Sequence, residues 1–287
     1  MRLIHLSDLH FGHHDDAVVD TLSAEIRAQN PDLIVVSGDF TQIGSRREFA
    51  RAREFLDTLS APVFAVPGNH DVPERNLVKR FINPYGHYRK YIHEDLEPFG
   101  VFGDVAIAGI KTSRRARLSF NWSDGTISRA QLERIEQRFD LHPEATCRVI
   151  VAHHPLLHPE EPMARFQRRV KRADKALEVF ARIGVRLVLS GHFHLSYVRR
   201  HEGPGAVREA APVGPRFAAS APILVAQASS TTSTRLRGEP NAYNVIEFHN
   251  GEIDIAVREW LGSKWVTREK TSESELPPVP ADQGLRL

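Results

Sequence analysis

Five short segments of this 287-residue chain combine carboxylates, imidazoles and an amide in patterns that could hold metal ions. The candidate ligands are Asp8, His10, Asp39, Asn69, His153, His192 and His194. Carboxylate, imidazole and amide oxygen together suit Mn, Fe or Zn, whereas oxygen-only sets suit Mg or Ca. Two cations about 4 Å apart need an anionic ligand between them, and a carboxylate can bridge them. Asp39, in the middle of the set, is the expected bridge.

Each of these segments follows a short apolar run that is typical of a buried strand. The predicted strands are residues 2–6, 33–36, 63–66, 148–152 and 186–189. Periodic apolar positions predict helices at residues 15–29, 45–59, 128–139 and 174–183. Open α/β sheets bind ligands at the carboxyl ends of their strands. We therefore expect the five polar segments to meet at such an edge.

The chain changes character after residue 195, where strands without intervening helices are predicted. These strands are residues 197–200, 223–226, 244–249 and 252–260, the last two joined by Asn250-Gly251, a type I′ hairpin signal. Strand–helix alternation followed by a strand-rich end predicts an α/β fold with two sheets packed together and helices outside. Residues 203–220 are expected to form a long loop. We expect one domain over residues 1–270 and a loose tail over residues 271–287.

The composition excludes several classes of protein. It contains 41% hydrophobic and 26% charged residues, as in globular proteins, and its net charge of +2 provides no strong field for nucleic acid. The lone Cys147 excludes an internal disulfide framework and suits a reducing compartment, so a cytoplasmic location is predicted. Residues 1–12 lack the apolar run of a signal peptide. No stretch approaches the ~18 apolar residues that would span a bilayer.

The motifs resemble, in order, those of the calcineurin-like metallophosphoesterases. They are Asp8-Leu9-His10, Gly38-Asp39, Gly68-Asn69-His70-Asp71, His153-His154-Pro155 and Gly191-His192-Phe193-His194, and they cover roughly the first two-thirds of the chain. Five ordered motifs are far more specific than one. The resemblance implies a four-layer αββα sandwich of two mixed sheets flanked by helices. It implies two metals, one held by Asp8, His10, Asp39 and His194, the other by Asp39, Asn69, His153 and His192.

The resemblance also implies a mechanism. A hydroxide shared by the two cations would attack phosphorus in line, and the cations would neutralise the developing charge. His70 would protonate the leaving alkoxide, and Asp71 would orient His70. The alternative for His70 is that it only positions Asn69. His154 is expected beside the ligands rather than among them.

The subclass is predicted from what the motifs lack and from the length. The stretch Gly38–Gly44 lacks the arginine with which phosphoprotein phosphatases hold a monoester, and the near-neutral charge argues against a DNA groove. The chain is most similar to the bacterial cyclic-nucleotide phosphodiesterase (class III) group. The expected substrate is a small phosphodiester of the cyclic-nucleotide or glycerophosphodiester type. The alternatives are a phosphomonoesterase, a DNA-acting nuclease and a non-catalytic scaffold, and the intact ligand set disfavours the scaffold.

Some features leave alternatives open. Residues 165–175 are strongly basic and predict either a solvated helix face or an anion-binding flap. Residues 231–238 predict a surface loop or a phosphate contact through Arg235 or Arg237. The sequence does not determine the oligomeric state, and a homodimer is one alternative. The remaining histidines that we considered are expected outside the ligand set: His5, His13, His14, His158 and His201.

Overall fold

The computed structural model describes residues 1–114, 124–159, 168–202, 222–273 and 278–279. Its helices are α1 (Asp16–Ala28), α2 (Arg46–Leu56), α3 (Leu77–Ile82), α4 (Gly86–Tyr91), α5 (Arg129–Asp140) and α6 (Ala173–Arg182). Its strands are β1 (Arg2–Leu6), β2 (Leu33–Val36), β3 (Val63–Ala65), β4 (Phe99–Phe102), β5 (Val105–Ile110), β6 (Cys147–Ala152), β7 (Val185–Ser190), β8 (Tyr197–His201), β9 (Ile223–Gln227), β10 (Ala242–His249), β11 (Glu252–Trp260), β12 (Trp265–Ser272) and β13 (Pro278–Val279). None of the described helices is long and apolar enough to cross a membrane.

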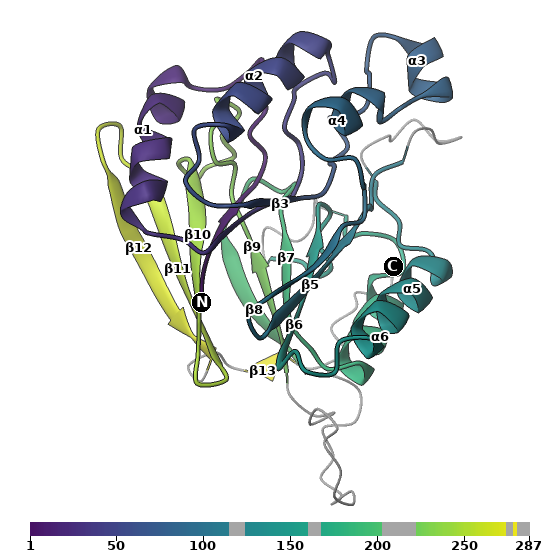
Figure 1. Cartoon of the computed structure of the whole chain (residues 1–287). Helices are drawn as coiled ribbons and strands as arrows, with labels where there is room; N and C mark the ends of the chain where they lie inside the picture. Colours follow the sequence, from purple (N-terminus) through teal and green to yellow (C-terminus); the bar gives the residue numbers. More distant parts are fainter. Residues whose placement is uncertain (115–123, 160–167, 203–221, 274–277, 280–287) are drawn as a thin grey trace, which may run out of the picture.

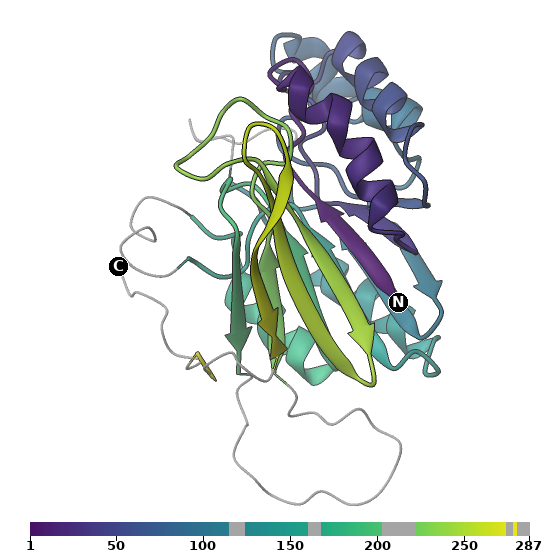
Figure 2. The ribbon, with the colours of Figure 1, turned by 90° about the vertical axis from the view of Figure 1, so that its left-hand side faces the viewer.

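The strands form two mixed sheets. One has the order β12-β11-β10-β1-β2-β3 and the other the order β13-β8-β9-β7-β6-β5-β4. In the first sheet β1, β2 and β3 run parallel, while β10 pairs with β1 in the antiparallel sense. In the second sheet β5, β6, β7 and β9 run parallel. The N-terminal strand therefore lies between β2 and a hairpin from the far end of the chain, as Figure 2 shows.

Three apolar clusters hold four layers together. Side chains such as Val35 and Leu187 fill the space between the two sheets. Helices α1, α2 and α4 cover the first sheet, with Val18 and Phe49 in the buried cluster. Helices α5 and α6 cover the second sheet on the opposite side of the molecule (Figure 1). The predicted αββα sandwich of two mixed sheets is confirmed.

The sequence explains where the longer helices begin. Asp15 caps α1 by accepting the N–H groups of Ala17 and Val18. Ser45 and Ser128 each start a capping box, with Glu48 and Gln131 reaching back to the cap backbone. Such caps each contribute about 1 kcal/mol, because they satisfy N–H groups that have no partner within the helix. The predicted helix 45–59 ends at Leu56 instead, three residues early.

The C-terminal region differs from the expectation at one boundary. The hairpin signal is correct, since Asn250 and Gly251 have φ angles of 51° and 79°, as a type I′ turn requires. The expected tail, however, begins too early. Thr271 and Ser272 belong to β12 and pair with β11, and residues 278–279 pair with β8. A strand can pair with a sheet edge through its backbone alone, without alternating apolar side chains. The polar composition of residues 271–279 therefore gave no sign of these pairings. The predicted loop at residues 203–220 lies outside the described residues.

Candidate metal centre

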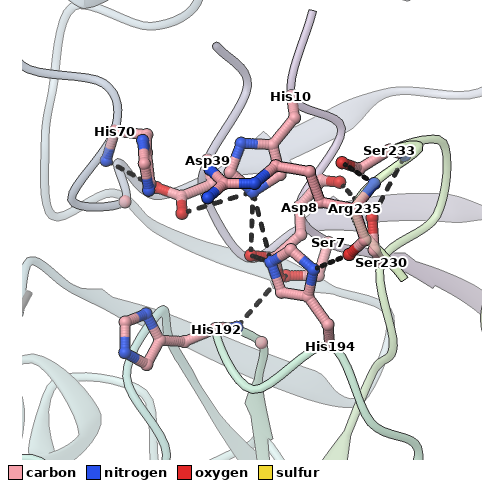
Figure 3. A network of polar contacts seen from close by, with 12 residues as sticks. Ser7, Asp8, His10, Asp39, His70, His192, His194, Ser230, Ser233 and Arg235 are labelled. Atoms are coloured by element: carbon pink, nitrogen blue, oxygen red, sulfur yellow. Dashed lines mark hydrogen bonds and ion pairs between the residues drawn. The ribbon is translucent and has the colours of Figure 1, made fainter. Parts of the chain in front are cut away.

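All seven candidate ligands meet at the carboxyl ends of the parallel strands, in the loops between the two sheets. Asp8 and His10 follow β1, Asp39 follows β2 and Asn69 follows β3. On the second sheet His153 follows β6, and His192 and His194 follow β7. Asp8, His10, Asp39, His153 and His194 are all at most 6% exposed. Figure 3 shows the imidazoles of His10 and His194 pointing toward one another beside Asp8 and Asp39.

Asp8, His10 and His194 form one half of the site. His194 Nε2 lies 3.2 Å from Asp8 Oδ1, and His10 Nε2 lies 3.5 Å from the same oxygen. The two Nε2 atoms are 3.3 Å apart. Two imidazole nitrogens bound at about 2.1 Å to one tetrahedral cation are separated by about 3.4 Å, so this triad has the dimensions of a metal cradle.

Asp39, Asn69 and His153 form the other half. His153 Nε2 lies 3.2 Å from Asp39 Oδ2 and 3.0 Å from Asn69 Oδ1. Asp39 Oδ2 is also 3.7 Å from His10 Nε2, so its carboxylate lies between the two halves. His192 joins this half through its ring, whose centroid is 5.2 Å from that of His153. The His-x-His pair therefore divides between the halves.

The donor set fits a pair of cations. Asp8 Oδ1 is buried and accepts no hydrogen bond, although its partner oxygen Oδ2 accepts bonds from Ser7 Oγ and from the backbone N–H of His192. An unsatisfied carboxylate oxygen costs free energy unless a cation or another donor meets it. The nearest groups to Asp8 Oδ1 are imidazole nitrogens, which are themselves metal ligands. A cation held between Asp8 Oδ1 and these nitrogens would satisfy the oxygen, so the donor set fits a metal.

Backbone strain is concentrated in the same residues. Of the eight described non-glycine residues with positive φ, five are candidate ligands: Asp8, His10, Asp39, His192 and His194. A side chain in this left-handed region costs about 1–2 kcal/mol, and such residues cluster at functional sites. In the His192-Phe193-His194 segment the two positive φ angles, 77° and 57°, turn the two imidazoles toward different halves of the site. The strain therefore serves to aim the ligands.

Two glycines allow the strands to approach the carboxylates. A Cβ on Gly68 would overlap the carboxylate of Asp39, and a Cβ on Gly191 would overlap Ser7 and lie 2.5 Å from Asp8 Oδ2. Neither neighbour is a flexible chain end that could move aside, because both carboxylates are fixed by hydrogen bonds. The sequence signal for these positions was the glycine before each motif.

Three histidine rings are oriented by backbone carbonyls. The Nδ1 of His153 lies 2.8 Å from Ser37 O, and the Nδ1 of His194 lies 2.9 Å from Arg235 O. The Nδ1 of His70 lies 2.7 Å from Gln42 O. A carbonyl only accepts, so each Nδ1 carries the proton and each Nε2 is left to face the site. Such second contacts fix the tautomer of metal-binding histidines.

The electrostatics keep both carboxylates ionised. Burial alone would favour the neutral acids, but the imidazoles around them outweigh it. The pKa of Asp8 is held well below its ordinary value, against burial, mainly by His194 and His10. The pKa of Asp39 is likewise lowered, against burial, by His153 and His70. Burial together with the neighbouring charge of His153 lowers the pKa of His192 to about 3, which leaves it neutral and able to bind a cation.

Asp71 was expected to orient the imidazole of His70, but its carboxylate contacts backbone N–H groups instead. Its carboxylate accepts the N–H of Gly68 at 2.8 Å and the N–H of Thr41 at 3.1 Å. The ring of His70 is held by the carbonyl of Gln42 instead. Thr41 Oγ1 links Asp71 to His70, since it lies 2.9 Å from His70 O and 3.1 Å from Asp71 Oδ1. Asp71 thus fixes the turn that carries His70 rather than its imidazole. Burial and the charge of Asp39 raise the pKa of Asp71 to about 7.

The sequence analysis did not predict the support that segment 229–233 gives the site, and residues 231–233 are buried rather than part of a surface loop. Segment 229–233 is a buried row of hydroxyl side chains behind the first motif, where Ser230 Oγ donates to Asp8 O at 2.8 Å. Thr231 exchanges hydrogen bonds with Ser7, and Arg235 is exposed. The unbroken Ser-Ser-Thr-Thr-Ser run after a buried strand was the available signal. His154 is held by Thr112 at 2.7 Å beside His192.

The basic run 165–175 is described only from residue 168. There Arg169 pairs with Asp174 at 2.7 Å, and Lys175 pairs with Glu178 at 2.8 Å. Both acids are exposed, which is the pattern of a solvated surface. Residues 165–167 lie outside the described residues.

A sandwich with buried carboxylates and imidazoles at the strand ends defines the class of metal-dependent phosphoesterases. The family description "calcineurin-like phosphoesterase" matches residues 1–196, which is more than half of the chain, and the chain therefore belongs to this family. It is similar in fold to a dimetal phosphatase from Danio rerio, with a TM-score of 0.61 and 13% identity, covering 93% of this chain and 98% of that one.

Two curated relatives are similar in sequence. A probable cyclic nucleotide phosphodiesterase of Synechococcus sp. is 29% identical over 176 residues, which cover 61% of this chain and 62% of that protein. A probable glycerophosphodiester phosphodiesterase of Arcobacter nitrofigilis is 27% identical over 128 residues, which cover 44% of this chain and 43% of that protein. Both matches thus span less than two thirds of the relative's length.

Proposed function

We propose that this chain is a binuclear-metal phosphodiesterase that hydrolyses a small phosphodiester of the cyclic-nucleotide or glycerophosphodiester type. The observation that carries the proposal is the position of Asp39. Its Oδ2 faces His153 at 3.2 Å and His10 at 3.7 Å, so one carboxylate connects two groups of metal-binding side chains. Residues 1–270 are taken as one domain, because the first sheet joins β1, β2 and β3 from the beginning of this range with β10, β11 and β12 from its end.

We assign one cation to Asp8, His10, Asp39 and His194, and the other to Asp39, Asn69, His153 and His192. When bound, two such cations make water nucleophilic near neutral pH and neutralise charge that develops at phosphorus. The chain contributes ionised carboxylates, imidazole nitrogens and their orientation. Mn, Fe and Zn all accept this donor set.

His70 is the proposed proton donor. Its Nδ1 is 2.7 Å from Gln42 O, so Nε2 is the atom that can face a leaving oxygen. Its ring lies edge-on to that of His10, a candidate ligand, with centroids 4.9 Å apart, and this proximity supports the role. An alkoxide is a poor leaving group unless it is protonated as it departs. Protonation by a positioned imidazole typically raises the rate ~10²–10⁴-fold. Asp71 serves this step indirectly, by holding the turn.

The choice of a diester is supported by the names of the two relatives and by the missing phosphatase arginine. A cyclic-nucleotide phosphodiesterase and a glycerophosphodiester phosphodiesterase share the cleaved bond, although they differ in substrate. The proposal is therefore confined to the bond and to a small substrate. A monoesterase is the alternative against which it is tested.

The test compares two chromogenic esters with metal-loaded protein. Bis(p-nitrophenyl) phosphate and p-nitrophenyl phosphate are offered with added Mn²⁺, and bound metal is measured on the same sample. We expect turnover of the diester. Turnover of the monoester alone would refute the diesterase assignment, and no turnover of either ester with metal bound would refute the enzyme. A panel of cyclic nucleotides and glycerophosphodiesters then separates the two substrate types.

A further inference from the structure

Helix α3 exposes an apolar patch on its surface. Four of the seven large apolar side chains that are exposed in the described residues lie on this one helix: Leu77 at 53%, Val78 at 69%, Phe81 at 50% and Ile82 at 80%. Their i, i+1, i+4 and i+5 spacing places them on one side of the helix. Figure 1 shows α3 at an outer corner of the molecule, beside α4. Exposed apolar residues that cluster in this way mark an interaction surface. We call these four residues the α3 patch.

Basic residues without an ion-pair partner among the described residues lie on and just before α3 and on the neighbouring helix α4 (Figure 1), where Lys90 Nζ is 5.5 Å from the ring centroid of Tyr91. Four basic residues of this region are exposed and form no ion pair with any residue that the structure describes: Arg75, Lys79, Arg89 and Lys90. Lys79 on α3 and Lys90 on α4 both lie near His87, whose pKa is lowered by burial and then by the charges of Lys79, Arg46 and Lys90. Glu74 is the sole acidic residue of segment 72–91, against five basic residues.

We propose that the α3 patch and its cations dock this protein on an anionic phospholipid surface. The apolar side chains would enter the boundary between headgroups and acyl chains, as those of interfacial helices do. The unpaired cations would remain at the level of the lipid phosphates, where each basic residue adds attraction. The combination matters, because neither a few apolar side chains nor a few cations anchor a protein firmly alone.

The charges argue against a second copy of the chain as the occupant. An isologous dimer places the same patch of both subunits together, so it would bring two sets of four unpaired cations to one interface. Like charges at an interface are unfavourable. Stable dimers also bury about 800 Å² on each partner, which four side chains of a six-residue helix do not provide. An anionic lipid surface accommodates both the apolar side chains of the α3 patch and the cations around it.

Docking would have a consequence for the candidate metal centre. Helix α3 follows, along the chain, the turn that carries Asn69 and His70. A protein held at the membrane by α3 would therefore present this side of the site near the headgroups. The binding itself does not depend on the proposed phosphodiesterase activity, so it is measured without any substrate.

The test is sedimentation of the full chain with vesicles. Vesicles of phosphatidylcholine and phosphatidylglycerol in equal parts should carry the protein down, whereas vesicles of phosphatidylcholine alone should not. Added salt should weaken the binding, because exposed charges are screened. Absence of binding to the anionic vesicles at low salt would overturn the proposal.

Paired variants distinguish the patch from general surface hydrophobicity. The double variant Val78→Asp/Ile82→Asp should lower the vesicle partition coefficient at least about tenfold, and Lys79→Glu/Lys90→Glu should do the same. The matched control is Leu141→Asp/Leu261→Asp, which alters two leucines that are 75% and 54% exposed elsewhere. All these positions are exposed, so thermal unfolding should show intact folds. Equal vesicle binding by Val78→Asp/Ile82→Asp, here called the α3 variant, and by the wild type would overturn the proposal. So would a dimer, seen by sedimentation velocity, that the α3 variant abolishes.

Discussion

Asp39 accepts the backbone N–H of His70 through Oδ1, at an N···O distance of 2.8 Å. The same carboxylate faces the imidazoles of the site through Oδ2. The residue that lies between the two groups of candidate ligands thus also fixes the turn on which the proposed proton donor stands. Loss of the charge and loss of the side chain should therefore have separable effects.

We predict that Asp39→Asn folds but binds metal poorly. The amide oxygen can still accept the N–H of His70, so the unfolding midpoint without metal should change little. An amide cannot offset the repulsion between two cations, so the metal content should fall from about two equivalents to less than one. Elemental analysis after gel filtration measures this. Two retained equivalents would contradict the bridging role.

Asp39→Ala is the companion variant. It removes the acceptor for His70 N–H as well, and an unpaired buried donor costs about 1–3 kcal/mol. We expect Asp39→Ala to be less stable than Asp39→Asn, as measured by urea unfolding, with metal lost in both. Equal stability would show that the hydrogen bond to His70 contributes nothing.

For His70→Gln we expect retained metal and a rate loss that depends on the leaving group. Gln cannot donate a proton to an alkoxide, so a diester with a poor leaving group should lose ~10²–10⁴-fold in kcat. Bis(p-nitrophenyl) phosphate, whose leaving group needs no proton, should lose far less. The comparison of kcat between the two substrates is the measurement. An equal loss on both would instead support a role for His70 in positioning Asn69.

The sequence predicted the ends of the strands well, because ligand side chains follow buried apolar runs directly. Asp8 follows β1 and His153 follows β6 at the expected positions. The αββα layers followed from the motif resemblance and from strand–helix alternation. Helices α3 and α4 were not predicted, since each has six residues and no apolar period facing a core.

Contacts through the backbone were beyond the reach of the sequence. The orienting partner of His70 is the carbonyl of Gln42, and that of His194 is the carbonyl of Arg235. Every residue has a carbonyl, so residue type holds no information about such partners. The hydroxyl row 229–233 was equally hidden, because it lies behind β1 only once the two sheets are packed together.

Cys147 should react slowly with alkylating reagents in the folded protein. Burial raises the pKa of its thiol to about 12, so almost no thiolate exists at pH 8. Labelling by iodoacetamide, followed by mass spectrometry, should be far slower than for the same thiol in urea. Fast labelling of the native protein at pH 8 would contradict this account.

The raised pKa of Cys147 also makes the stability of the fold depend on pH. Because the folded pKa of Cys147 is raised above the unfolded value near ~8.5, folding favours the protonated thiol. This contribution is fully present below about pH 8.5 and is lost as the pH rises toward 12. Cys147→Ser, whose hydroxyl does not titrate in this range, should reduce the fall in stability between pH 8 and pH 10. Urea unfolding at the two pH values tests this, and an unchanged fall would refute it.

Arg258 should stabilise the contact between the first sheet and α1. Its guanidinium lies 2.6 Å from Glu25 Oε1, and the hydroxyl of Tyr243 donates to the same oxygen at 2.7 Å. The side chains of Arg258 and Glu25 are only 19% and 15% exposed. We predict that Arg258→Met lowers the free energy of unfolding by about 1–3 kcal/mol, because Glu25 then loses its counter-ion in a half-buried place.

A matched control separates this pair from an ordinary surface ion pair. Arg53 contacts Asp57 at 2.7 Å, but the two side chains are 39% and 66% exposed. Arg53→Met should therefore change the free energy of unfolding by less than about 1 kcal/mol, since exposed pairs contribute little. Added salt should weaken the Arg53 pair more than the Arg258 pair, because burial limits screening. Urea unfolding at two salt concentrations measures both effects. Equal losses in the two variants would mean that burial of the Arg258–Glu25 pair adds nothing to the stability of the sheet.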